Sequence, residues 1–260
     1  MFLKLMKHEL YAAGRVLLPL FGGLLLAAGL ARGSIWVTAE SQSDILNLLG
    51  GFLIAVFVLG CLATIILTVV LLMLRFARSV HGDEAYLTHT LPVGVHGILL
   101  SRLLSSFLWL VCAFAAVYLG FRICTAGIKP LDQAGRFLRF LLDQSGVDPD
   151  RMLLEGLLLG LVSSLSGILQ TFAAISIGHS FNSGKTGMSV VFFFVLTAAS
   201  SLITNLLNLL ASNTLLRSLE QTPGRLLDAT SLLSLGTGLL FCGLYYFLTW
   251  FTVKKRLNLG

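Results

Sequence analysis

The residues best suited to contact another protein lie at 75–96, in the polar stretch RFARSVHGDEAYLTHTLPVGVH. This stretch contains two Arg, an Asp–Glu pair and three His, whereas residues 50–74 before it and 103–121 after it contain no charge. Such a segment cannot lie in hydrocarbon. It must be a polar connection held at the membrane surface by the helices on either side.

The middle of this connection predicts a short helix. Gly82 is followed by an acidic pair that could cap and start a helix, and the proline after Leu91 would end it. A helix with an acidic and aromatic face toward the cytoplasm would be a suitable lever for a partner protein; the alternative is a solvated loop. The predicted contact residues are Gly82, Asp83, Glu84, Ala85, Tyr86, Leu87 and Pro92.

Motifs for catalysis and for nucleotide binding are incomplete. His8–Glu9 could begin an HExxH zinc motif, but residue 12 is Ala, so the second ligand is missing. Residues 178–186, GHSFNSGKT, nearly spell a phosphate-binding loop, but His179 occupies the place of its first glycine. We therefore expect a chain that is not an enzyme and that binds no metal or cofactor itself.

The composition is that of a membrane protein. The 260 residues are 56% hydrophobic and 12% charged, against about 25% charged in soluble domains. The net charge of +6 is spread over loops and ends, so nucleic acid is not an expected partner. The cysteines are expected to be small packing residues, and they are Cys61, Cys112, Cys124 and Cys242.

Six apolar runs predict an all-α, polytopic fold with six transmembrane helices in one domain, residues 1–260. Each run has about the 20 residues needed to cross a bilayer core. None has an ionisable residue near its middle, which argues against an ion-coupled carrier. The runs are residues 16–37, 50–74, 98–121, 152–177, 188–210 and 231–253.

The charge distribution predicts that both termini are cytoplasmic. With the N-terminus inside, the inner segments contain ten Lys and Arg against three acids, and the outer segments contain eight against nine. Residues 1–15 are expected to form an amphipathic helix at the cytoplasmic interface, or else a basic lead-in that sets topology. Residues 121–151 then form an extracytoplasmic loop, with either a surface helix or a gate or substrate contact.

Two spans contain residues suited to helix contacts. Span four has GxxxG spacing, which lets helices approach closely: Gly156, Gly160 and Ser164. Span five has polar side chains along one face that could bond a neighbouring helix or line a translocation path: Thr197, Ser201, Thr204, Asn205 and Asn208.

The polar connection also resembles a known family. Residues 82–93, GDEAYLTHTLPV, resemble the GDEGYLTFTLPV signature of bacterial six-helix permeases of the ATP-binding-cassette type 2 exporter family. The signature lies between the second and third spans in both. Residues 177–182, IGHSFN, look like that family's connection between spans four and five. Ala85 stands where the family commonly has Gly.

The resemblance implies partners and a mechanism. Two permease subunits would pair, as a homodimer or a heterodimer, in the bacterial plasma membrane. Each would dock a separate ATP-binding subunit, which holds ATP and Mg, through the helix at residues 82–92. Substrates of this family are often peptides, antibiotics or lipids, moved outward. The alternative is a non-transporting membrane scaffold or immunity protein that uses the same loop.

Overall fold

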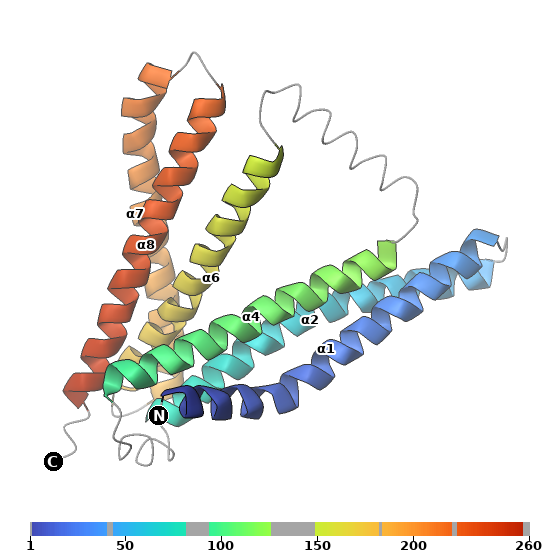
Figure 1. Cartoon of the computed structure of the whole chain (residues 1–260), viewed down its shortest axis with the longest axis horizontal. Coiled ribbons are helices and arrows are strands. Elements are labelled where there is room, and N and C mark those ends of the chain that lie inside the picture. The colour runs from blue at the N-terminus through green and yellow to red at the C-terminus, as the bar shows by residue number, and fades with distance from the viewer. Residues whose placement is uncertain are drawn as a thin grey trace. The chain divides into compact units, whose positions relative to one another are not determined.

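The computed structural model describes residues 2–40, 44–81, 94–125, 149–181, 184–219 and 223–256, and these are almost entirely helical. The described helices are α1 (Phe2–Glu40), α2 (Asp44–His81), α4 (Val95–Thr125), α6 (Pro149–Gly178), α7 (Lys185–Leu219) and α8 (Pro223–Arg256) (Figure 1). Six helices are long and apolar enough to cross a membrane. The prediction of an all-α chain with six candidate spans is therefore confirmed.

The helices extend well beyond the apolar runs. α1 has 39 residues, about 58 Å at 1.5 Å per residue, whereas a bilayer core is about 30 Å thick. From Phe2 on, the predicted lead-in therefore belongs to the same helix as the first span. α1 changes direction after its first turns (Figure 1), and Pro19 lies inside it, where the missing N–H bends a helix. That the lead-in lies at an interface stays a prediction.

Large apolar side chains are exposed along the candidate spans, as lipid contact requires. Ile45 and Leu48 of α2 are 80% and 79% exposed. The most apolar window of α7 contains no buried residue, and Phe194 and Leu202 of that helix are both mostly exposed. Surfaces this apolar are unfavourable in water and suit hydrocarbon.

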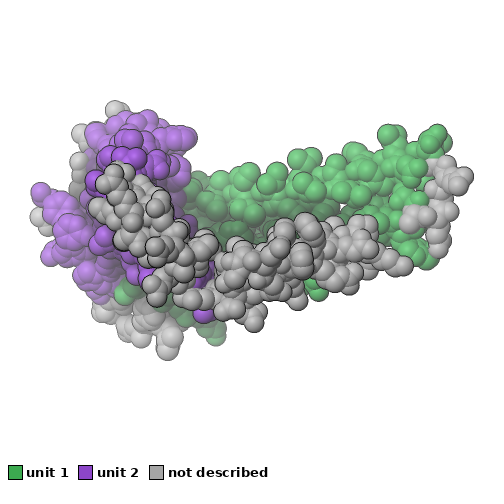
Figure 2. All heavy atoms as spheres, turned by 90° about the horizontal axis from the view of Figure 1, so that it is seen from above, with its two compact units in different colours: residues 1–75, 100–133 green, residues 76–99, 134–260 purple. Residues whose placement is uncertain are grey.

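The chain divides into two compact units (Figure 2). Unit 1 comprises residues 1–75 and 100–133, and so contains α1 and most of α2 and α4. Unit 2 comprises residues 76–99 and 134–260, with the end of α2, the start of α4, and α6, α7 and α8. Both α2 and α4 contribute to each unit.

The core of unit 1 combines large and small side chains from three helices, and the small ones let the helices approach closely. The rings of Phe21 and Trp109 lie 6.2 Å apart, and a Cβ on Gly120 would stand 3.2 Å from Phe57. One cluster contains Ala13, Leu17, Phe21, Leu72, Trp109, Ala113 and Ala116. A second contains Leu24, Ala28, Ala31, Phe57 and Cys124, so Cys124 is a packing residue, as expected.

In unit 2, α6 packs against both α7 and α8 (Figure 1). Two glycines allow the closest approaches. A Cβ on Gly238 of α8 would stand 2.7 Å from Val162 of α6. A Cβ on Gly178, the last residue of α6, would overlap the backbone of Ser189 in α7. These contacts require glycine because no side chain fits between the helices.

Several buried hydroxyl groups bond to their own helix. Thr64 donates to the Gly60 carbonyl at 2.8 Å, and Thr68 donates to the Thr64 carbonyl at 2.7 Å. Thr249 of α8 donates to the Tyr245 carbonyl, also at 2.7 Å. Each hydroxyl is thereby satisfied without water and without a neighbouring helix.

Candidate functional site

The predicted contact helix at residues 82–92 lies outside the described residues. Its seven residues, Gly82, Asp83, Glu84, Ala85, Tyr86, Leu87 and Pro92, are therefore not placed. The described chain reaches this segment through the end of α2 and the start of α4. The candidate functional site therefore consists of these two helix ends and the residues that contact them.

In unit 1, one carboxylate joins three helices. Glu9 of α1 forms an ion pair with Arg102 of α4, and its Oε2 lies 3.7 Å from the Arg75 guanidinium of α2. The side chains of Glu9 and Arg102 are only 12% and 9% exposed. A pair this buried interacts strongly, and loss of one partner would leave a charge that is costly to bury.

The two arginines of this ion-pair cluster lie on the helix segments directly before and after residues 82–93. Arg75 precedes residue 82 by seven positions, and Arg102 follows residue 93 by nine. Arg75 is the more exposed of the two, so its pair with Glu9 contributes less. The cluster holds the C-terminal part of α2 and the N-terminal part of α4 against α1.

In unit 2, the end of α2 is fixed by an aromatic stack. The rings of Phe76 and Phe172 lie 3.7 Å apart and nearly parallel, at 5°. Phe76 is 1% exposed and Phe172 is also buried. Aromatic pairs of this kind add to the free energy gained by burial alone, so α2 is held firmly against α6.

The start of α4 is held by a second aromatic group in unit 2. His96 Nδ1 and the Tyr246 hydroxyl of α8 form a 2.8 Å hydrogen bond. The imidazole also stacks on Trp250 at 5.3 Å, and Lys254 Nζ lies 4.8 Å from the centre of the same indole. The first turn of α4 is thus attached to the last turns of α8.

Both helix ends beside residues 82–93 are therefore held by identified contacts. Within unit 2, Phe76 binds α6 and His96 binds α8; within unit 1, Arg75 and Arg102 share Glu9. Charge, hydrogen bonding and aromatic stacking resist displacement better than apolar contact alone. Displacing the end of α2 or the start of α4 would therefore break these contacts or move the helices joined by them.

The polar face predicted on α7 is mostly exposed. Thr197 accepts a 2.7 Å hydrogen bond from Gln170 Nε2 of α6, which is the helix-bonding role predicted for this face. The other members are exposed or half-buried, namely Ser201, Thr204, Asn205 and Asn208. Whether they line a translocation path stays a prediction.

The predicted GxxxG contact on α6 is open in the single chain. No atom of the described residues lies within 4 Å of a Cβ built on Gly156 or Gly160, apart from their own helix. Ser164 donates to the Leu161 carbonyl of α6 at 2.9 Å. Contact with another helix therefore stays a prediction for these three residues.

Within the sequence that nearly spells a phosphate-binding loop, the described residues 178–181 and 184–186 lie at the end of α6 and the start of α7. His179 Nδ1 lies 2.9 Å from the Ile175 carbonyl oxygen and 3.5 Å from Ser189 Oγ. Gly184 adopts φ 66°, a backbone conformation that favours glycine. The His179 side chain thus has a structural role at the end of α6.

The importance of Glu9, Tyr246 and Trp250 was not predicted from the sequence. Glu9 is the one acid in a basic lead-in, and Arg102 is the one charge at the start of an apolar run, so their pairing had a signal. Tyr246 and Trp250 lie among many aromatics of the last span, and nothing in their spacing marks them.

No cluster of three or more His, Cys, Asp or Glu suited to a metal ion occurs among the residues that the structure describes. The chain matches no protein-family model, no curated protein and no solved structure.

Proposed function

We propose that this chain is the membrane-spanning subunit of an ATP-driven exporter. The observation behind the proposal is the resemblance of residues 82–93 to the permease signature, in the connection between the second and third of six candidate spans. A second permease chain, identical or different, would complete the translocation path. A separate ATP-binding subunit would supply the energy.

The contacts at the helix ends support a coupling role for this connection. A segment that receives force is useful only if its flanking helices move with it. Phe76 and His96 hold those helices to α6 and α8, and Glu9 holds them to α1. With these contacts, a displacement of residues 82–92 would move α2 and α4 together with the helices they contact.

In the proposed mechanism, nucleotide binding brings two ATP-binding subunits together. Their movement shifts residues 82–92, and the shift tilts α2 and α4 with the helices attached to them. The path between two permease chains then changes from inward to outward access. Helix tilts of this kind are a known form of conformational switching.

Glu84→Lys and Tyr86→Asp test the coupling segment. Each reverses or adds charge on the face expected to contact the ATP-binding subunit. We expect at least a tenfold loss of transport-linked ATP hydrolysis, because an unpaired charge at a desolvated contact costs about 2 kcal/mol or more. The measurement is a mild-detergent purification of the tagged chain from its native membrane, with assays for ATP hydrolysis and a co-purifying soluble subunit.

Glu40→Lys is the matched control for Glu84→Lys, because it makes the same charge change at the end of α1, far in sequence from residues 82–92. Tyr86→Phe is the control for Tyr86→Asp, because it removes the hydroxyl but keeps the aromatic ring and adds no charge. Normal ATP hydrolysis and an intact complex in both test variants would show that the coupling segment is placed wrongly. A chain that purifies with no ATP-binding subunit in several detergents would favour the scaffold function instead.

A further inference from the structure

An open groove runs along the N-terminal part of α1 in unit 1. It has a volume of about 530 Å³ and is lined by Met6, Lys7, Leu10, Tyr11, Gly14, Arg15, Leu18 and Trp109. The size is within the range typical of small-molecule sites, about 300–1,000 Å³. The groove does not involve the contacts assigned above to coupling.

The lining residues of α1 form two parallel rows, because residues four apart are neighbours on a helix. One row is apolar or without a side chain: Met6, Leu10, Gly14 and Leu18. The adjacent row is polar and cationic: Lys7, Tyr11 and Arg15, all exposed. The Arg15 guanidinium lies 5.7 Å from the centre of the Tyr11 ring.

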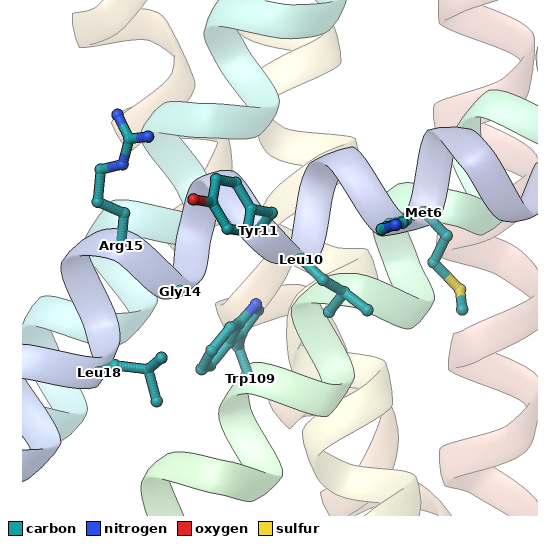
Figure 3. Close-up of a pocket in the computed structure, with 8 residues that line it drawn as sticks. Met6, Leu10, Tyr11, Gly14, Arg15, Leu18 and Trp109 are labelled. Carbon is teal, nitrogen blue, oxygen red and sulfur yellow. The ribbon is translucent and has the colours of Figure 1, made fainter.

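Trp109 of α4 forms the base of the groove, beneath Gly14 and between Leu10 and Leu18 (Figure 3). A Cβ on Gly14 would stand 2.9 Å from the indole carbon Cζ2, so glycine is what lets the ring lie here. The buried Trp109 Nε1 has no hydrogen-bond partner among the described side chains and backbone. A buried donor without an acceptor is costly.

We propose that this groove binds an anionic phospholipid. An acyl chain would lie along the apolar row against Trp109. The phosphate would be bound by Arg15 and Lys7, since guanidinium groups bind phosphate in a bidentate manner. A lipid ester carbonyl is an acceptor of the kind that Trp109 Nε1 lacks. A hydrocarbon row beside a cationic row matches this amphiphile and no wholly apolar or wholly polar ligand.

Quenching of Trp109 fluorescence tests the site directly. The chain has three Trp, so W36F/W250F leaves Trp109 as the fluorophore. This protein is reconstituted in phosphatidylcholine vesicles doped with acyl-brominated phosphatidylglycerol, or with an equal mole fraction of acyl-brominated phosphatidylcholine. Bromine quenches on contact, so selective occupancy predicts stronger quenching by the anionic lipid than by the zwitterionic one.

K7Q/R15Q removes both cations while keeping side chains of similar polarity. A cation near an anionic lipid surface contributes about fivefold to binding, so the two together favour the anionic lipid by roughly 25-fold. We expect the excess quenching to disappear in K7Q/R15Q. The matched control is K254Q/K255Q, which removes two cations from the end of α8 and should leave it unchanged.

Equal quenching by both brominated lipids, or an excess that persists in K7Q/R15Q, would overturn the proposal. If K7Q/R15Q loses helical circular dichroism, the W36F/W250F protein is titrated with salt, which should lower the excess by screening; insensitivity to salt would also overturn it. The assay requires no ATP-binding subunit, so its outcome is independent of the proposed transport function.

Discussion

Glu9 shows how one residue can have a role that its surroundings in the sequence conceal. It lies in a segment whose cations suggest a topology signal, yet its carboxylate is largely buried between Arg102 and Arg75. The sequence marks Glu9 and Arg102 as isolated charges, but their burial together with Arg75 depends on how three helices distant in sequence pack. Its energetic importance follows from burial, since the same pair on an open surface would contribute little.

Glu9→Gln should lower the free energy of unfolding by about 3 kcal/mol, because the guanidinium of Arg102 would stay buried without its carboxylate. The measurement is unfolding in mixed micelles with increasing dodecyl sulfate, followed by circular dichroism. Asp44→Asn is the matched control, since Asp44 is exposed at the start of α2 and should change stability by less than about 0.5 kcal/mol. Equal stability of Glu9→Gln and the parent would contradict the buried pair.

The six helices were predictable because a span must be apolar to lie in lipid, and hydropathy measures this property directly. All six candidate spans lie within or around the apolar runs, since a helix must satisfy its own backbone in hydrocarbon. The helix ends were not predictable in the same way: α2 continues to His81, through polar residues that also suit a loop. Interhelical contacts such as Phe76 with Phe172 arise from packing, which one-dimensional periodicity does not encode.

The glycines illustrate this limit at the level of elements. Spacing indicated Gly156 and Gly160 of α6, where the chain itself places nothing nearby. The structure instead brings helices closest at Gly178 and Gly238. A GxxxG pattern indicates a helix face that another helix can pack against closely. Which helix packs there depends on the fold or on another chain.

Gly178→Ala should therefore disrupt the connection of α6 with α7. Its methyl group would overlap the Ser189 backbone, which cannot rotate away as a side chain could, and we expect a loss of about 2 kcal/mol or more, typical of overpacking. Thermal unfolding in detergent measures the change. Gly156→Ala is the control, because open space surrounds that position; it should be neutral or slightly stabilising. Similar behaviour of both variants would contradict the close approach.

For the whole molecule, the prediction that both termini are cytoplasmic rests on charge alone. Six spans require the two termini to lie on the same side, and Lys254 and Lys255 at the end of α8 favour the inside. We expect a cytoplasm-dependent fluorescent protein to be active when fused to either end. A periplasm-dependent phosphatase should be active when fused within residues 126–148. Phosphatase activity of a fusion at either terminus would contradict the predicted orientation.

The threonines that bond to their own helices affect how easily the molecule can rearrange. Because Thr64, Thr68 and Thr249 donate to carbonyls of the helix that bears them, sliding one helix along another breaks none of these bonds. The barrier to such sliding comes from the contacts that do join different helices, such as the Glu9 ion pairs and the hydrogen bond of His96 with Tyr246. These hydroxyls therefore make the interior more polar without raising the energy barrier to movement between helices.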